Sequence, residues 1–405
     1  MNNPIDRRSL LISTLALASA GVASLVTAGP AYSAAPASTT ATGRGTAAAA
    51  RPATATAYGP NGTHYPADLP WVGESAPFEI VVNCDWASIA AAIKSLTPAR
   101  VAQGVAIRVK PGTLPGGGAG SSSKAVLAGV GSTAWTRNVL ICPQQGFGSV
   151  TVASTGIRFD QCARLSFFGF VSAGAFCMTL CADMQMGWSR WDAMSITRGG
   201  KNIALYEVVL GFRRNADDTS GVRPTDTYEL TNISRYGCVF GPSVKPAGSS
   251  AHCDTIQLEG TGTGVFGPFT SIDCVDYGSS NAVAMLHARL TLAEYRHCLI
   301  LGDQLPWQVF PLTAADYAGR PNAFSGGGMD VRLYDSVVCG AVGGTDFTTV
   351  ERTSLSYQPQ SSQLPTVSGS WTVDTSIAAW NRATIMALQD VDDYQTATLA
   401  AIWKW

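Results

Sequence analysis

The predicted fold rests chiefly on residues Ala251–Gly302, which read AHCDTIQLEGTGTGVFGPFTSIDCVDYGSSNAVAMLHARLTLAEYRHCLILG. Short apolar or alternating runs within it, Thr255–Leu258, Ala282–Leu286 and Leu299–Leu301, are separated by clusters of Gly, Ser, Asn and Asp. No run is long enough for a helix, so the runs are typical of brief strands that end at tight corners. Three cysteines recur at intervals of 21 and 24 residues. A repeat of this length predicts a solenoid, in which each coil buries its apolar face only by stacking on its neighbours.

The composition favours one all-β solenoid over two ordinary domains. Gly accounts for 42 of the 405 residues and only 14% of the residues are charged, which suits short strands joined by tight corners. The net charge of −1 gives no electrostatic reason to expect nucleic acid or an anionic membrane as a partner.

The first 35 residues predict a targeting segment. The sequence Asp6-Arg7-Arg8-Ser9-Leu10-Leu11 precedes a short apolar run, and small residues at 31–35 offer a cleavage site. The segment resembles a bacterial twin-arginine signal; an ordinary secretory signal is the alternative, and either implies a secreted protein. Residues 36–57 are rich in Ala, Thr and Pro and predict a disordered leader.

The ten cysteines all lie beyond these segments, between Cys84 and Cys339. An exported protein permits disulfides. Most of these cysteines nevertheless sit in apolar runs such as LIC and SVVC, where a thiol behaves as a small apolar group. We therefore expect an internal ladder of stacked, mostly reduced cysteines, with one or two bridges at most.

Residues 78–112 predict the start of the solenoid. A strand is followed by Asp85, a good N-cap, and by apolar residues at helical spacing at 86, 89, 93 and 96, with Pro98 just past the helix and a further strand at Val105–Val109. This pattern resembles the first coil of the pectate-lyase-like superfamily. The resemblance implies an all-β, single-stranded right-handed parallel β-helix whose open end is covered by a capping helix.

Later segments such as GIRFDQCARLSFFGF and GKNIALYEVVLGF resemble β-helix coils, and we place the β-helix domain at residues 58–373. Three segments depart from the pattern, 184–198, 212–226 and 303–328, and are predicted to be loops beside a binding groove. Residues 374–405 regain a helical period and predict a C-terminal helical tail that packs on the solenoid.

Acidic residues within the opening stretch are the candidate catalytic groups. Asp254 lies 22 residues before Asp276 and 19 before Asp273, so adjacent coils would bring either pair together. Paired carboxylates suit glycosidic cleavage, because one donates a proton while the other attacks or activates water. His252 and Glu259 complete the set. The sequence HCDTIQ at 252–257 resembles strands of secreted β-helix proteins, and its placement is similar to that in family-28 polygalacturonases, although Asn-Thr-Asp and Gly-His-Gly are missing.

Substrate-binding candidates are aromatic and basic. Indole rings offer stacking platforms for sugars, and arginine or lysine could bind anionic sugars, although packing and surface roles compete for every one of these residues. The candidates are Trp188, Arg190, Trp191, Arg213, Arg235, Lys245, Arg289 and Trp307.

These observations predict a secreted glycoside hydrolase that uses paired carboxylates, needs no cofactor or metal, and acts on a polysaccharide or oligosaccharide as a monomer or homotrimer. The first alternative is a polysaccharide lyase, with Lys245, Arg235, Arg289 or the pair Arg213 and Arg214 as the basic group and Ca²⁺ held by Asp254, Asp273 and Asp276. The second alternative is a non-catalytic carbohydrate-binding solenoid. Nucleotide enzymes, zinc proteases of the HExxH type and α/β-hydrolases are disfavoured, because their motifs are absent.

Overall fold

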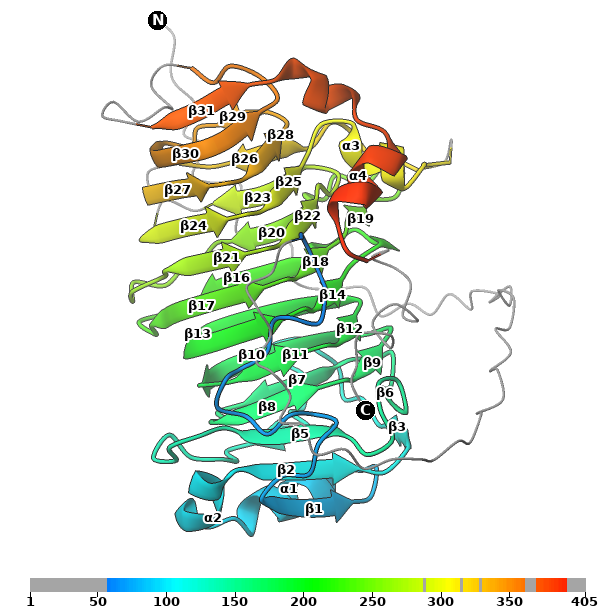
Figure 1. Ribbon diagram of the computed structural model, residues 1–405, viewed down its shortest axis with the longest axis vertical. Coiled ribbons are helices and arrows are strands. Elements are labelled where there is room, and N and C mark those ends of the chain that lie inside the picture. Colours follow the sequence, from blue (N-terminus) through cyan, green and yellow to red (C-terminus); the bar gives the residue numbers. More distant parts are fainter. Residues whose placement is uncertain (1–56, 287–288, 314–315, 328–329, 361–368, 392–405) are drawn as a thin grey trace, which may run out of the picture. The chain divides into compact units, whose positions relative to one another are not determined.

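The computed structural model describes residues 57–405 apart from 287–288, 314–315, 328–329, 361–368 and 392–405. All of these residues belong to one compact unit, residues 51–405. This unit is a parallel β-helix, which confirms the predicted fold class (Figure 1). The predicted signal segment and almost all of the predicted leader lie outside the described residues.

Each coil contributes up to three strands, and strands of successive coils pair in parallel, so the solenoid has three faces. The first face contains β4 (Leu127–Ala128), β7 (Ile157–Asp160), β10 (Ala175–Ala182), the first half of β13 (Ala193–Tyr206), β16 (Ser220–Pro224), β20 (Asp254–Leu258), β23 (Ala282–Leu286), β26 (Asn322–Ser325) and β29 (Val342–Gly343). The second face contains β1 (Phe78–Val82), β2 (Val105–Val109), β5 (Val139–Pro143), β8 (Leu165–Phe168), β11 (Gln185–Gly187), the second half of β13, β17 (Leu230–Tyr236), β21 (Phe269–Ile272), β24 (Leu292–Arg296), β27 (Asp330–Tyr334) and most of β30 (Phe347–Leu355).

The third face contains β3 (Gly112–Leu114), β6 (Val150–Val152), β9 (Val171–Ser172), β12 (Arg190–Trp191), β14 (Val209–Leu210), β18 (Val239–Phe240), β22 (Val275–Tyr277), β25 (Leu299–Leu301), β28 (Val337–Cys339), the end of β30 and β31 (Ser370–Val373). A separate two-stranded sheet joins β15 (Arg213–Arg214) to β19 (Ser243–Val244).

The length of a coil varies widely along the solenoid. Phe324 pairs with Val342 on the first face, 18 residues on, whereas Ala284 pairs with Phe324, 40 residues on. Cys274 and Cys298 lie at equivalent corners between the second and third faces, but the equivalent residue one coil earlier is Cys238, not Cys253. The interval from Cys253 to Cys274 therefore does not correspond to one coil, whereas the interval from Cys274 to Cys298 does. The solenoid repeat that the sequence predicted is nevertheless present.

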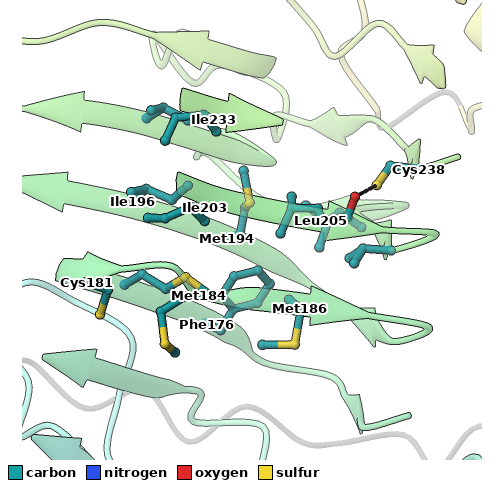
Figure 2. Close-up of a cluster of buried hydrophobic side chains, with 14 of the residues drawn as sticks. Phe176, Cys181, Met184, Met186, Met194, Ile196, Ile203, Leu205, Ile233 and Cys238 are labelled. Carbon is teal, nitrogen blue, oxygen red and sulfur yellow. Dashed lines mark hydrogen bonds between the residues drawn. The ribbon is translucent and has the colours of Figure 1, made fainter. Parts of the chain in front are cut away.

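Inward-facing side chains of successive coils stack into one continuous apolar core. Figure 2 shows part of it, where Ile196, Ile203 and Ile233 lie with Met184 and Met186 between neighbouring coils. All ten cysteines lie in the described part of the chain and are free thiols, nine of them buried. The cysteines are thus free thiols, but the stacked ladder that we expected is partial, because Cys238, Cys274 and Cys298 occupy equivalent corners of successive coils and Cys253 does not.

The predicted capping helix is α1 (Trp86–Lys94). The carboxylate of its N-cap, Asp85, accepts a hydrogen bond of 2.6 Å from the backbone N–H of Ser88, as the sequence indicates. Trp86 and Ile89 are buried in the solenoid core. Pro98 lies just past the end of α1, as predicted, and it also begins a second short helix, α2 (Pro98–Gln103), in whose first turn an N–H would have no partner within the helix.

The C-terminal tail contains a 3₁₀ helix, η3 (Thr375–Ala379), and α4 (Arg382–Leu388); residues 392–405 lie outside the described residues. Ile377 and Ile385 are buried in one apolar cluster with Leu299 and Leu301 of the third face. Two residues of the short helix α3 (Leu305–Val309), Leu305 and Val309, belong to the same cluster. The tail therefore packs along the side of the solenoid. Across the described ranges, no helix has the length and apolar character needed to cross a membrane.

Candidate active site

A groove of ≈ 280 Å³ lies on the first face. Its floor consists of small or hydroxyl side chains from β10, β13 and β16, among them Ser195, Thr197 and Gly221. One wall is the segment Ala119–Ser121. The other consists of Asp217 and Asp218, in the polar loop between β15 and β16, with Arg213 and Arg223 from those two strands. This loop belongs to 212–226, one of the segments that the sequence analysis placed beside a binding groove.

Asp218 and Arg223 form the charged part of the groove. One carboxylate oxygen of Asp218 accepts a hydrogen bond of 2.8 Å from the backbone N–H of Asp254, and the other accepts one from Arg223. The Arg223 guanidinium also donates to the amide oxygen of Gln257 on the adjacent coil. Burial raises the pKa of Asp218, although the Asp254 N–H and the Arg223 charge oppose this change.

Asp254 lies directly behind Asp218 at the start of β20 and is fully buried. Its Oδ1 accepts a hydrogen bond of 2.7 Å from the side-chain amide of Asn281, whereas its Oδ2 has no hydrogen-bond partner among the described residues. Burial raises the pKa of Asp254 to about 7; the Asn281 hydrogen bond opposes the rise, and the negative charges of Asp218 and Glu259 add to it. This carboxyl group therefore exchanges its proton near neutral pH.

The arrangement places a carboxyl group that titrates near neutral pH against a groove-lining carboxylate, 36 residues apart in sequence but on adjacent coils. Two interacting carboxylates whose environments differ are the usual basis of acid–base chemistry. The neighbouring arginines, Arg213 and Arg223, can neutralise a negative charge on a bound molecule. The groove and the residue directly behind it thus bring together two carboxyl groups in different environments and two arginines.

Three predicted site residues lie inside the solenoid instead. Arg235 and Asp276 are fully buried and form a bidentate ion pair with N–O distances of 2.7 and 2.8 Å. Trp191 is 1% exposed and packs in the core against Phe176. Because a substrate on the outside of the solenoid cannot reach these side chains, their placement corrects the expectation that they act on it directly.

Asp273 and Trp188 lie beneath an N-terminal strap, which we define as residues 58–76 and which runs along the corner between the second and third faces (Figure 1). The backbone carbonyl of His64 accepts a hydrogen bond of 3.0 Å from the Trp188 indole, which is 1% exposed. Trp188 is therefore a docking surface for this strap, and its ring is not presented to a sugar.

His64 holds the strap in place between two carboxylates. Its Nδ1 lies 2.8 Å from Glu207 and its Nε2 lies 2.8 Å from Asp273. Burial alone would lower the pKa of His64, but hydrogen bonds and charges from Asp273 and Glu207 outweigh it and raise the pKa to about 9. The imidazole of His64 fits at this place because residue 237 is Gly, with φ +58°. A Cβ at residue 237 would clash with the ring.

Asp273 makes a second charged contact on its other side. Its Oδ1 lies 2.6 Å from Nδ1 of His297, whose ring stacks on Tyr58 of the strap at 4.0 Å between centroids. Burial would raise the pKa of Asp273, but the two histidines lower it. Asp273 therefore works as a structural anchor between the strap and the solenoid.

The remaining predicted residues do not converge on one site. Glu259 is half-buried on β20's C-terminal side, and its charge acts on Asp254. His252 is exposed in the preceding loop. The other basic and aromatic candidates make local contacts: Arg190 lies over the Phe212 ring, Lys245 donates to the carbonyl of Ala251, Arg289 donates to the carbonyl of Gly264, and the Trp307 indole donates to the carbonyl of Gly319. Of the predicted substrate-binding residues, only Arg213 lines the groove.

Sequence reasoning missed Asp217, Asp218, Arg223 and Gln257. A signal for the first two existed, since Asp217 and Asp218 are adjacent acids in a polar loop that had already been singled out. Segment 184–198, in contrast, was wrongly predicted to be a loop: β11, β12 and the start of β13 make it an ordinary coil.

The structure also bears on the Ca²⁺ site expected for a lyase. Asp254 lies behind the groove, Asp273 is under the strap, and Asp276 is in the core, so the three carboxylates do not face a common point. Within the described ranges, no group of three or more His, Cys, Asp or Glu residues is arranged to hold a metal ion. The expected cluster of these three aspartates is therefore wrong.

No family model and no curated protein matches the sequence. Among solved structures, a PL6-family alginate lyase is 13% identical with a TM-score of 0.40, covering 68% of this chain and 43% of its own. A rhamnogalacturonan lyase is 10% identical with a TM-score of 0.34, covering 67% of this chain and 79% of its own. The A-module of an Azotobacter vinelandii mannuronan C-5 epimerase is 11% identical with a TM-score of 0.26, covering 71% and 93%.

The chain thus spans less than half of the length of the alginate lyase that it matches. These neighbours are polysaccharide lyases and an epimerase, and identities of 10–13% limit the likeness to the general fold.

Proposed function

We propose that this protein is an enzyme that cleaves glycosidic bonds of a polysaccharide bound along the first face of the β-helix. The observation that supports the proposal best is the pair Asp218 and Asp254, in which the groove-lining Asp218 carboxylate accepts a hydrogen bond from the backbone N–H of Asp254, and the buried carboxyl group of Asp254 has a pKa of about 7. A purely structural corner aspartate would be expected to have both of its oxygens hydrogen-bonded, yet Oδ2 of Asp254 is buried and has no partner among the residues that the structure describes.

In this proposal Asp218 is the general acid that protonates the leaving glycosidic oxygen. Asp217, which is exposed and lines the same groove, activates the attacking water. Asp254 exchanges its own proton near neutral pH, and the negative charge of Asp218 contributes to this raised pKa. Arg223 orients Asp218 through their ion pair and binds substrate oxygens on its exposed side.

A lyase remains the second candidate, because Arg213 and Arg223 line the groove beside the same carboxylates. An arginine can neutralise the carboxylate of a uronate, the charge that must be stabilised when a base removes the C5 proton. In that reading Asp218 or Asp217 is the base. Secretion and the choice between monomer and homotrimer remain predictions from the sequence.

The test is to incubate the protein with a panel of neutral and uronic polysaccharides while following two products. Reducing ends alone indicate hydrolysis, whereas reducing ends with the ultraviolet absorbance of an unsaturated uronate indicate β-elimination. We expect Asp218→Asn to reduce the rate about 10²–10⁴-fold, the usual contribution of an acid–base group.

The matched control is Asp335→Asn, which makes the same change on an exposed carboxylate paired with Arg352. It should leave the rate unchanged. Binding of a glycan without any product would instead favour a non-catalytic carbohydrate-binding solenoid, and full activity of Asp218→Asn would refute the proposed site.

A further inference from the structure

A second, larger cavity of ≈ 540 Å³ adjoins the groove. This cavity lies between β19 on one side and, on the other, the end of α3 with residues 310–312 that follow it. β19 and α3 are neighbours in Figure 1. Seven of its nine lining residues are apolar: Phe212, Pro242, Val244, Val309, Phe310, Pro311 and Leu312. Its size falls in the range of ~300–1,000 Å³ that is typical of small-ligand pockets.

Arg213 connects this apolar cavity to the groove, because it lines both. Its Nη1 donates to Asp192 at 2.8 Å, whereas its Nε is buried and has no hydrogen-bond partner in the described part of the chain. Arg214, the other basic residue of the cavity, pairs with Asp316 at 2.9 Å and its side chain is 64% exposed. The cavity is thus apolar inside, and the edge that meets the groove carries two guanidinium groups, each paired with an aspartate.

The lining restricts what can bind there. An unsubstituted sugar would place several hydroxyl groups against the apolar side chains of Val244, Val309 and Leu312, which offer no hydrogen-bond partner, so its burial there is disfavoured. An acyl chain or aromatic ring carries no such penalty and gains from burial against Phe212 and Phe310. Oxygen atoms next to that group would face Arg213.

We infer that this cavity is a subsite for an apolar substituent, an acyl or aromatic ester, carried by an anionic polysaccharide whose backbone lies in the groove. The inference rests on the proposed function and adds a substrate class to it: glycans that are both charged and esterified. The Nε–H of Arg213, which is unpaired among the described residues, can donate to an oxygen of the bound glycan, and the apolar lining selects the ester over the bare hydroxyl.

Binding is tested first with 8-anilinonaphthalene-1-sulfonate, a probe that joins an apolar ring system to an anionic group. We expect one site per chain by fluorescence titration and a loss of affinity of about tenfold or more in Leu312→Asp, which puts a charge into the cavity from a half-buried loop position. Phe310→Ala, which removes a wall without adding charge, should also weaken binding.

The control variant is Val265→Asp, which places the same charge at an exposed apolar residue, 49% accessible, that does not line the cavity. It should bind the probe as the unmodified protein does. Equal affinity in Leu312→Asp, Phe310→Ala and the control would overturn the inference, whatever the activity of the protein.

The second arm uses a polysaccharide that the protein cleaves, before and after removal of its esters with mild alkali. We expect kcat/KM to fall about tenfold or more after removal of the esters. The same loss should appear for Leu312→Asp on the esterified substrate, and this variant should no longer distinguish the two substrates. Equal cleavage of both substrates by the unmodified protein overturns the ester subsite but leaves the cleavage proposal intact. Probe binding at the cavity without cleavage of any polysaccharide supports the apolar subsite and overturns the cleavage proposal.

Discussion

The ion pair between Arg235 and Asp276 offers the sharpest test of how this solenoid is stabilised. Both side chains are fully buried, and the guanidinium also donates to the Ser271 hydroxyl at 2.7 and 3.1 Å. It lies 4.5 Å from the ring centroid of Phe240 and 5.2 Å from that of Phe269. Removing one partner leaves a desolvated charge without its counterion, which costs about 3–5 kcal/mol, while replacing both by apolar residues is often neutral or stabilising.

We therefore expect Asp276→Leu and Arg235→Met each to lower the free energy of unfolding by about 3–5 kcal/mol at pH 7. The double variant should cost far less than the sum of the two single changes, so the double-mutant cycle should show a coupling of about 3 kcal/mol or more. The two single variants differ in one respect. A lone buried carboxyl group can take up a proton, whereas a guanidinium cannot lose one, so only the cost of Arg235→Met should shrink as the pH falls.

Chemical unfolding monitored by far-ultraviolet circular dichroism at pH 5 and pH 7 measures these quantities. The matched control is the exposed pair Asp335 and Arg352, whose side chains are 47% and 59% accessible and whose removal should cost at most about 1 kcal/mol. The reasoning is refuted if either buried single variant is as stable as the unmodified protein, or if the double variant loses the full sum.

Three further predictions concern other parts of the chain. Asp254→Asn should raise the free energy of unfolding by about 2–4 kcal/mol at pH 8 and by less at pH 4. The reason is that folding raises the pKa of Asp254 from 3.8 to about 7, so the native protein loses stability as the pH rises through that interval. Unfolding midpoints at both pH values check this. His64→Gln should destabilise the protein by about 3 kcal/mol near pH 6, and the difference should fade as the pH rises from about 6.5 past 9, since the raised pKa contributes stability only while the imidazole is protonated; a loss that does not depend on pH would contradict the charged contacts with Glu207 and Asp273. Titration with a thiol reagent should find ten thiols in denaturant and rapid reaction of only Cys84 in the native protein, because the other nine are buried; fewer than ten would mean that a disulfide forms.

The fold was predictable because it follows from local patterns. Short apolar runs between Gly and Asn clusters indicate strands and corners, and Asp85 with its helical spacing indicates the cap; neither depends on distant residues. The register of one coil on the next did not follow from the sequence, since the spacing of paired residues ranges from 16, between Val331 and Phe347, to 40, between Ala284 and Phe324. The expected pairs of Asp254 with Asp273 or Asp276 assumed regular coils, whereas the carboxylate that meets Asp254 lies 36 residues before it.

Burial of polar groups was equally hidden. In the sequence Val275-Asp276-Tyr277 the aspartate looks like the exposed member of an alternating strand, but in the solenoid it points inward toward an arginine 41 residues earlier. Trp188 looks like a surface platform because the segment that covers it comes 124 residues before it in the chain. In both cases the deciding contact is nonlocal, and no spacing rule within a strand can reveal it.

The strap also sets an order of events during folding. Its residues are synthesised before any coil, yet His64 contacts Asp273, 209 residues later, and Tyr58 pairs with Gln389 near the end of the tail. Such contacts close very long loops, so they form late. A ribosome-bound chain that ends before Asp273 has no complete seat for the strap, and the indole of Trp188 stays uncovered until the later coils exist. The first segment of the β-helix domain to be synthesised is therefore the last to fold, because it can pack only against a solenoid whose coils have already formed.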